Sequence, residues 1–331
     1  MSSHRSVLKA FKRALKNFGL TVAAARTTTG NHRVYAELEA ELAEFFDAED
    51  ALLLPAGYMA PAAVAQAMAG NVSHALIDER AHPALFDATQ FLGCPVLRFE
   101  HRNPIHFART AARCGPGARI IVFTDGMFAF DGSVAPLRAY LRSMPSDGLI
   151  VVDDAHGGGV VGATGKGTVE FEAVSRRRIV QCITLSKAFG SFGGAVIGTH
   201  AFRRRVLARS RMFAGSTPIP LPLAAGAFAA LKVLQTDRSL RTRLARNSAC
   251  VKTALRRAEV PIPETPGPIV SIELRSAVAI ARLKRRLLAA GIYPPFLRYP
   301  GGPPKGYFRF AISSEHTPAQ LNALIRVLES A

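Results

Sequence analysis

Short apolar runs alternate along the chain with longer stretches in which apolar residues recur every three or four positions. The runs predict buried strands, and they lie at residues 52–54, 75–77, 96–99, 119–123, 149–152, 179–185 and 195–197. The periodic stretches predict amphipathic helices, at residues 34–46, 60–68, 83–91, 104–112 and 136–142. Strands that alternate with helices of this length form a mostly parallel sheet covered by helices on both faces. This part of the chain therefore predicts an α/β fold.

A long helical stretch then joins two parts of the chain, and the pattern changes from Pro261 onward. One long helical stretch over residues 221–258, with a break at Asp237, leads into strand 269–274, helix 277–290, strand 307–312 and helix 318–328. This is the pattern of a small α+β module. We therefore expect a large domain over residues 1–235 and a smaller C-terminal domain over residues 236–331.

The N-terminal residues 6–18 predict a further helix of the large domain. It carries Leu8 and Phe11 on one face, and Lys9, Lys12 and Arg13 on the other. A basic amphipathic helix of this kind can lie on a membrane surface. More often such a helix packs on its own domain, and we favour that interpretation.

The composition is that of a folded protein, with 331 residues of which 49% are hydrophobic and 20% are charged. The formal net charge of +18 raises the question of a nucleic-acid partner. The basic residues are scattered without interleaved aromatics, so we expect no nucleic acid. We interpret the charge as a solvated surface that also attracts anionic substrates.

Targeting signals and cysteine usage favour a cytoplasmic protein. The N-terminus lacks the apolar core and cleavage site of a signal peptide. The longest uncharged stretch, residues 51–77, is interrupted by Pro55, Pro61 and Gly70, so we expect no membrane span. The four cysteines show no regular spacing and predict buried thiols rather than disulfides; they are Cys94, Cys114, Cys182 and Cys250.

Lys187 follows the apolar run 179–185 and precedes a glycine-rich segment, in the stretch ITLSKAFGSFGG. There an amine can be desolvated, which lowers its pKa, and an unprotonated amine can form a Schiff base with an aldehyde. An isolated lysine in such a place is more often a surface residue in a loop. A second motif upstream supplies the partner that a Schiff-base cofactor needs.

That motif is LIVVDDAHGGGVVG, in which a strand runs into Asp153, Asp154 and His156. A buried carboxylate at a strand end keeps the ring nitrogen of pyridoxal phosphate protonated, which lets that cofactor accept electrons. Because consecutive side chains on a strand point to opposite sides, we assign this role to Asp153. The carboxylates could instead cap a turn or bind a metal. Asp-x-x-His without a further His or Cys is a poor metal site, so we expect no metal.

Two strand-to-helix turns add weaker signals. Gly57 and Tyr58 lie where the strand 52–54 meets the next helix, and backbone N–H groups at such a turn can bind a phosphate. Many turns of this type contain glycine, so the signal alone is weak. His82 stands at the start of the helix 83–91, where a lone histidine is usually a cap.

Together these motifs resemble those of the α-oxoamine synthases, which are fold-type-I pyridoxal phosphate enzymes. The resemblance is carried by VVDDAHGGGVVG and TLSKAFG, together with LLLPAGYMAPAAV, DERAHPALFDA, TDGMFAFDG and FAGSTPIP. They occur in the family's order over nearly the whole chain, and DDAHGGGVVG and ELEAELAEF are most similar to the 8-amino-7-oxononanoate synthase branch. The resemblance implies an aspartate aminotransferase-like large domain, a smaller α+β domain, and a homodimer with active sites at the subunit interface.

The resemblance also implies roles for individual residues. Ser216 and Thr217 would reach the phosphate of the neighbouring subunit's cofactor; they could also cap a helix that begins near Pro218, and both can be true. Lys187, Asp153 and His156 would be catalytic. The implied cofactor-binding residues are Gly57, Tyr58, His82, Asp153, His156, Thr184, Lys187, Ser216 and Thr217, and the implied substrate-binding residues are His82, Arg26 and Arg309. His82 would stack on the cofactor ring, and Arg309 would bind the substrate carboxylate.

Four features depart from the family pattern. Tyr35 stands where the family usually has a histidine, and Ala129 stands where it has a serine that reaches the cofactor's phenolic oxygen, which leaves that contact to His156. In the loop 299–305, Gly301 or Gly302 falls where a threonine often contacts substrate. The family's Asn-Tyr-Leu-Gly stretch is not present, because the sequence starts after it.

The reaction implied by the resemblance is the decarboxylative condensation of a small α-amino acid with an acyl thioester of coenzyme A or of an acyl carrier protein. Two alternatives remain open. One is another fold-type-I enzyme, an aminotransferase or a lyase. The other is a non-catalytic binding protein that keeps the fold.

Overall fold

The computed structural model of the chain describes residues 1–299 and 302–329. It divides into two compact units. Unit 1 consists of residues 1–127 and 135–236, and unit 2 consists of residues 128–134 and 237–331. The expected division after residue 235 did not include the short segment 128–134, which groups with the C-terminal part of the chain.

Seven strands of the described chain form the sheet of unit 1, in the order β1-β7-β6-β5-β4-β2-β3. Strands β2 to β6 pair in parallel, whereas β7 pairs antiparallel with β6 and β1. The mostly parallel sheet predicted from the sequence is confirmed. Its strands are β1 (Asp50–Leu54), β2 (His74–Asp78), β3 (Val96–Phe99), β4 (Ile120–Asp125), β5 (Leu149–Asp153), β6 (Ile179–Thr184) and β7 (Gly194–Gly198).

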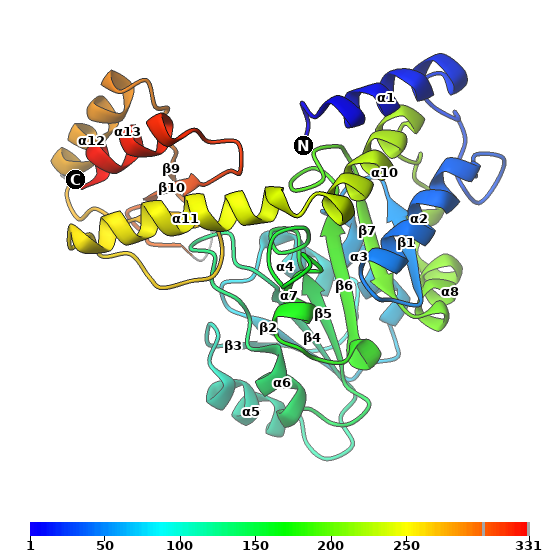
Figure 1. Cartoon of the computed structure of the whole chain (residues 1–331). Coiled ribbons are helices and arrows are strands. Elements are labelled where there is room, and N and C mark those ends of the chain that lie inside the picture. The colour runs from blue at the N-terminus through cyan, green and yellow to red at the C-terminus, as the bar shows by residue number, and fades with distance from the viewer. Residues whose placement is uncertain (300–301, 330–331) are drawn as a thin grey trace. The chain divides into compact units, whose positions relative to one another are not determined.

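Helices cover both faces of this sheet (Figure 1). Strand β1 shows the reason, because Leu52 and Leu54 belong to a core with α3, α4 and α8, whereas Ala51 and Leu53 belong to a second core with α2 and α10. The helical segments of unit 1 are α1 (Arg5–Phe18), α2 (Arg33–Phe45), α3 (Met59–Met68), α4 (Pro83–Thr89), α5 (Pro104–Ala112), α6 (Leu137–Ser143), α7 (Thr168–Phe171), η1 (Arg176–Arg178), α8 (His200–Arg209), α9 (Arg211–Ala214) and α10 (Leu221–Thr236).

Helix α1 packs along α10, so the interpretation that it packs on its own domain is confirmed. Val7 and Ala14 are its buried residues. Within the described residues, no helix is long and apolar enough to cross a membrane.

Unit 2 contains a three-stranded antiparallel sheet in the order β8-β10-β9, and Thr317 caps its last helix in a capping box with Gln320. Its core joins Leu255 and Leu283 with Phe308 of the sheet. The elements are α11 (Ser239–Arg257), β8 (Ile269–Ile272), α12 (Ala277–Ala289), β9 (Phe296–Leu297), β10 (Tyr307–Ala311) and α13 (Pro318–Leu328). Helix α10 ends at Thr236 and α11 begins at Ser239, so the predicted break at Asp237 is confirmed.

The segment 128–134 belongs to unit 2 because polar contacts fix it there. Gly267 N donates to Gly132 O at 2.9 Å, and Thr265 Oγ1 donates to Asp131 O at 2.7 Å. The amine of Lys252, whose side chain is buried, donates in turn to Thr265 O at 2.8 Å and to Gly267 O at 2.6 Å. A buried lysine thus ties α11 to the loop that holds this segment.

Two sequence expectations differ from the structure. Helix α8 was not predicted, because it buries only Val206 and its other positions are largely basic; Thr199 caps its start by accepting from Phe202 N. Of the four cysteines, only Cys182 is buried, while Cys94 and Cys114 are partly exposed and Cys250 is exposed. The expectation of four buried thiols is therefore wrong for three of them.

Candidate active site

The candidate residues gather at the carboxyl ends of neighbouring strands, where parallel sheets hold their ligands. Asp125 ends β4 and Asp153 ends β5, and the two residues are cross-strand partners in the register of the sheet. The adjacent strand β6 ends at Thr184, three residues before Lys187. His82 follows β2, the neighbour of β4 on the other side. Four strands thus direct these residues to one edge.

Lys187 and His156 lie in direct contact, with 2.9 Å between Lys187 Nζ and His156 Nε2. Burial has the largest effect on two neighbouring residues, since it raises the pKa of Asp153 and lowers the pKa of His82. The positive charge of Lys187 has a smaller effect and lowers both pKa values. Lys187 itself is exposed in this single chain, so the expectation of a desolvated amine is not met here.

The two neighbouring aspartates differ sharply in their partners. The carboxylate of Asp154 accepts from Thr168 N at 2.7 Å, from Thr168 Oγ1 at 2.7 Å and from Gln181 Nε2 at 2.6 Å. Among the described residues, the carboxylate of Asp153 has one hydrogen-bond donor, Ala155 N at 3.1 Å. Burial raises the pKa of Asp154 as well, while its three donors lower it. Asp154 is therefore bound within the fold, and Asp153 keeps acceptor capacity for another group.

Three glycines make room for the Asp154 carboxylate. A Cβ atom would lie 2.4 Å from Asp154 Oδ1 at Gly126, 2.0 Å from Oδ1 at Gly157, and 1.9 Å from Oδ2 at Gly167. Gly167 also has φ +86°, which few L-residues adopt. These three glycines thus leave space for a buried aspartate, which is a different role from making a loop flexible. Gly159 has a further role, because a Cβ there would lie 2.7 Å from Ala188 Cβ, beside Lys187.

The turn of Gly57 and Tyr58 lies against the end of β6. A Cβ at Gly57 would lie 2.7 Å from Thr184 Cβ, and one at Gly194 would lie 2.6 Å from Gly57 Cα. The turn opens α3, where no side chain caps the helix start. Its backbone therefore comes close to the strand that leads to Lys187.

His82 caps α4, since its Nδ1 accepts from Ala84 N at 3.1 Å. Its own backbone N–H donates to the Asp125 carboxylate at 2.7 Å. The ring of Tyr58 meets the His82 ring edge-on, with 5.9 Å between the centroids. The cap predicted from the sequence is confirmed, and it orients the imidazole at the sheet edge.

Asp125 ends an apolar strand in the motif TDG, and the sequence assigned it no role in catalysis or binding. It is buried, and burial followed by the charge of Asp153 raises its pKa well above the ordinary value. Its contact with the backbone of His82 joins two strands at this edge. The position of Asp125 after an apolar strand predicts that it converges with Asp153 and Lys187 on one crevice, and the register of the sheet places Asp125 beside Asp153.

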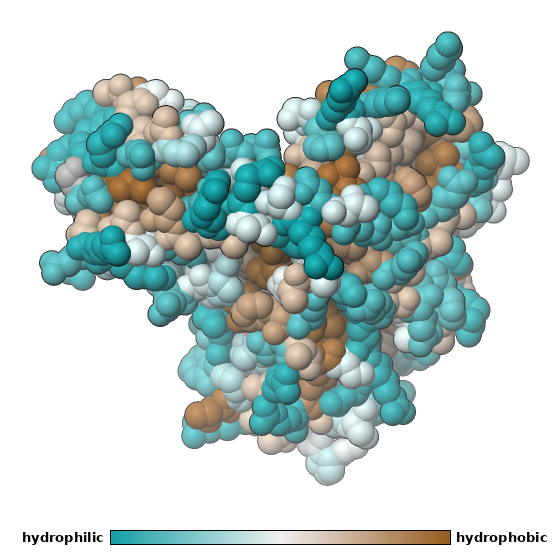
Figure 2. Space-filling view, in the orientation of Figure 1, coloured by the Kyte–Doolittle hydropathy of each residue, from teal (hydrophilic) through white to brown (hydrophobic). Residues whose placement is uncertain are grey.

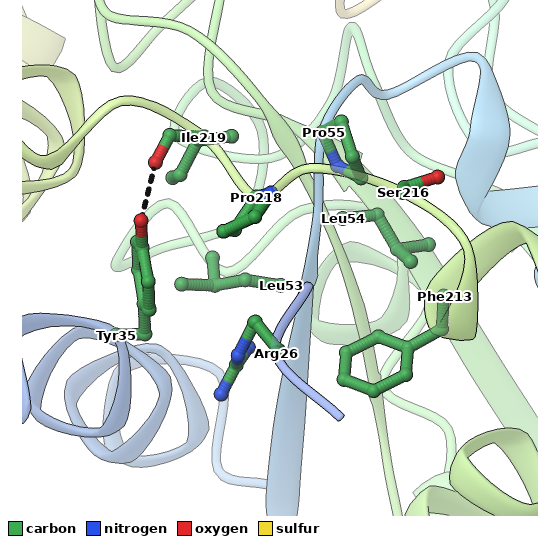
Figure 3. A pocket seen from close by; sticks show the side chains of 9 residues that line it. All are labelled: Arg26, Tyr35, Leu53, Leu54, Pro55, Phe213, Ser216, Pro218 and Ile219. Atoms are coloured by element: carbon green, nitrogen blue, oxygen red, sulfur yellow. Dashed lines mark hydrogen bonds between the residues drawn. The ribbon is translucent and has the colours of Figure 1, made fainter. Parts of the chain in front are cut away.

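Arg26 lines a small pocket that it shares with Ser216 and with Leu54 at the end of β1 (Figure 3). Its guanidinium forms two hydrogen bonds with the Glu39 carboxylate, and both side chains are almost fully buried, at 6% and 5% exposed. The ring of Tyr35 lies 5.2 Å from the Arg26 guanidinium carbon, and its hydroxyl donates to Ile219 O at 2.7 Å. Arg26 is thus engaged inside unit 1, and its role in substrate binding stays a prediction.

Ser216 does not cap a helix, because α10 begins only at Leu221 and the Ser216 hydroxyl donates to Met212 O at 2.6 Å. The expected cap near Pro218 is therefore wrong, and Thr217 is exposed. The proposed contact of these two residues with a neighbouring subunit stays a prediction.

Arg309 lies on β10 in unit 2, where its Nη1 donates to Ala129 O at 3.3 Å. Of the loop 299–305, residues 300 and 301 lie outside the described residues, and so does the expectation about Gly301. Within the described residues, no group of three His, Cys, Asp or Glu side chains could hold a metal ion.

Comparison with known proteins places this fold and site in a class. Residues 1–328 match the family model described as aminotransferase class I and II. The chain therefore belongs to the aminotransferase class I and II family.

Individual relatives narrow this class. The 8-amino-7-oxononanoate synthase of Thioalkalivibrio sulfidiphilus is 32% identical over 99% of this chain and 85% of its own length. A putative 8-amino-7-oxononanoate synthase of Desulforudis audaxviator is 34% identical over 100% of this chain and 87% of its own. The serine palmitoyltransferase of Sphingomonas wittichii superimposes with a TM-score of 0.94 at 25% identity, over 99% of this chain and 84% of that one. Within its family the chain is an α-oxoamine synthase, a pyridoxal phosphate-dependent acyltransferase.

Proposed function

We propose that this protein condenses a small α-amino acid with an acyl thioester of coenzyme A or of an acyl carrier protein, with loss of carbon dioxide and release of the thiol. The observation that carries the proposal is the gathering of Lys187, His156 and buried Asp153 at one sheet edge. The related oxononanoate synthases and serine palmitoyltransferases support the reaction class. The unpaired cysteines fit a reducing compartment such as the cytoplasm.

Pyridoxal phosphate fits the residues present. Asp153 is 8% exposed and has spare acceptor capacity, which suits a protonated pyridine nitrogen. The Gly57 turn, where a Cβ would collide with Thr184, leaves bare backbone at the start of α3, which suits a phosphate. A related serine palmitoyltransferase structure, with a TM-score of 0.94 to this chain, contains the cofactor.

When bound, the cofactor supplies an electron sink for negative charge at the amino acid's Cα. The amine of Lys187 would hold the cofactor's aldehyde carbon, and it is the group that would take the proton from the amino acid's Cα. His156 contacts the Lys187 amine and orients it. Asp153 would keep the pyridine nitrogen protonated. His82 is fixed by its cap and by Asp125, and its ring lies at the same edge.

We propose Arg309 as the ligand of the substrate carboxylate, because it resembles the family's arginine that precedes a Ser-x-x-His segment, which Ser313 and His316 supply here. The imidazole of His316 accepts from Ser313 N at 3.1 Å, which gives this turn a fixed shape. A guanidinium grips a carboxylate with two parallel hydrogen bonds, and a lysine cannot. Arg309→Lys should therefore raise the KM for the amino acid by roughly tenfold or more; an unchanged KM would remove Arg309 from the site.

The decisive experiment identifies the lysine and the reaction together. After borohydride reduction of the loaded enzyme, peptide mapping should place the pyridoxyl group on Lys187. Lys166→Ala is the matched control, since Lys166 also lies in a glycine-rich segment but pairs with Asp47, and it should keep the label. Thiol release should require both amino acid and thioester and should equal carbon dioxide release. Turnover of the amino acid without thioester would indicate an aminotransferase or lyase instead.

We also propose that the active site is shared across a homodimer, with Ser216 and Thr217 contributed by the neighbouring subunit. A heterodimer of a Lys187→Ala chain with a Ser216→Ala/Thr217→Ala chain should recover part of the activity, since one of its two sites is intact. A confirmed heterodimer without activity would contradict sharing.

A further inference from the structure

A groove of about 400 Å³ runs between α1, α2 and α10, apart from the candidate active-site residues. Small side chains form its floor, which explains why the space between the helices is not filled. Figure 2 shows hydrophilic residues along α1 with apolar residues directly below it. The apolar lining comes from Ala10, Ala14, Phe18, Val34, Ala225, Phe228 and Ala229.

Three cations line this groove. Lys9 and Arg13 are one helical turn apart on α1, and Arg33 is the first residue of α2. Among the described residues, none of the three has an ion pair or a side-chain hydrogen bond. Glu37 is the only acidic residue of the lining, so the groove is positive.

The local sequence concentrates this charge at a cost. The first 36 residues contain seven Lys and Arg and no Asp or Glu. Like charges one turn apart on a helix destabilise it by roughly 0.2–0.5 kcal/mol per pair, and α1 has no acidic residue to offset them. The positive end of the α2 dipole adds to the same potential. A destabilisation of a helix without local compensation is expected where the residues are needed to bind a ligand.

Val7 and Gly226, which adjoin the groove residues Ser6 and Ala225 in the sequence, lie close to the loop that follows Lys187. A Cβ at Gly226 of α10 would lie 3.6 Å from Val7 Cγ1 of α1 and 3.6 Å from Ser191 Oγ. The Ser191 hydroxyl donates to Leu223 O at 2.6 Å, which fixes this loop to α10. Ser191 follows Lys187 by four residues, so their Cα atoms are at most about 14 Å apart.

We propose that this groove binds the phosphate-bearing nucleotide end of coenzyme A, while the pantetheine arm reaches toward Lys187. This inference rests on the proposed function and selects coenzyme A over a carrier protein. A concave site of this volume with a few polar groups and an apolar lining is of small-molecule size. Lys9, Arg13 and Arg33 pair with phosphate oxygens, and the ring of Phe228 packs on the adenine. A second copy of this positive surface would be repelled.

The test is calorimetric titration of free coenzyme A into the cofactor-loaded enzyme. Lys9→Ala/Arg13→Ala should weaken binding by about tenfold or more, and raised salt should weaken the native protein's binding in the same direction. Lys12→Ala/Lys16→Ala is the matched control, because it removes the same charge at the same spacing from α1 outside the groove. This control should change the affinity by no more than about twofold.

The same titration with Lys187→Ala separates this inference from the proposed function. Coenzyme A should still bind to that variant, whatever happens to the activity, because the groove is intact. Equal losses of coenzyme A affinity in Lys9→Ala/Arg13→Ala and in Lys12→Ala/Lys16→Ala would refute the groove as the binding site. So would binding of the native protein to vesicles with anionic lipid, or to an acyl carrier protein, that Lys9→Ala/Arg13→Ala abolishes while coenzyme A binding is unchanged.

Discussion

Replacing each of the two neighbouring aspartates by alanine should separate structure from chemistry. Asp154→Ala removes the acceptor for Thr168 N and for Gln181 Nε2, both held by one carboxylate oxygen. Each orphaned buried donor costs roughly 1–3 kcal/mol, so the two together should cost about 4 kcal/mol. The Thr168 hydroxyl can turn elsewhere and adds little.

Asp153→Ala should leave the fold almost as stable. It orphans only the N–H of Ala155, which is partly exposed, and it removes a carboxylate whose pKa burial has raised. These effects have opposite signs, and we expect a net change within about 1 kcal/mol. Catalysis should be lost, because the pyridine nitrogen loses its partner.

The assay is thermal unfolding of the cofactor-free protein at neutral pH, followed by calorimetry. Asp154→Ala should lower Tm by about 10 °C, and Asp153→Ala by no more than about 3 °C. Asp154→Asn is an internal check, since its amide oxygen can keep both N–H donors while the Thr168 hydroxyl turns to accept from the amide nitrogen; its cost should be near 1 kcal/mol. Greater destabilisation by Asp153→Ala than by Asp154→Ala would refute the assignment.

Three further substitutions test neighbouring contacts. Glu39→Gln leaves the almost fully buried Arg26 guanidinium without its counter-charge, so chemical denaturation should show a loss of about 3–5 kcal/mol; a loss below about 1 kcal/mol would contradict the buried pair. Gly57→Ala places a Cβ 2.7 Å from Thr184 Cβ and should weaken cofactor binding by roughly tenfold in a spectroscopic titration; an unchanged affinity would contradict this close approach. Because burial raises the pKa of Asp125, the folded protein keeps a proton that the unfolded chain releases above about pH 4, so the free energy of unfolding falls as pH rises from there to the raised pKa. Asp125→Asn can still accept from the backbone N–H of His82, so it should remove this pH dependence and raise Tm at pH 7. A lower Tm at pH 7 would contradict the effect that burial predicts.

The strand ends could be predicted from the sequence because apolar runs and the residues that follow them are local features. Alternation along β5 predicted that Asp153 and Asp154 differ in orientation, and the structure gives the two carboxylates different partners. The coarse fold and the helix break at Asp237 were predictable for the same reason. These features depend on the hydrophobic pattern within about ten residues.

The features that could not be predicted depend on contacts between segments that are distant in the sequence. The glycines around Asp154 come from positions 126, 157 and 167, and nothing in the local pattern of any one of them indicates a carboxylate. The pairing of Arg26 with Glu39 is likewise invisible to a scan that reads each motif alone. The exposure of Lys187 depends on what covers the end of β6, which a single chain's sequence pattern does not specify.

Because residues 128–134 belong to unit 2, they constrain the order in which the two units can fold. Thr265 Oγ1 donates to Asp131 O across 134 residues of chain, and the amine of Lys252 fixes the same loop. During synthesis this segment emerges early, and its partners become available only after the rest of unit 1 has been made. The C-terminal part alone, cut after unit 1, would present unpaired backbone groups where the segment belongs. Unit 2 therefore completes its folding late, and it includes a segment that lies in the sequence between the two parts of unit 1.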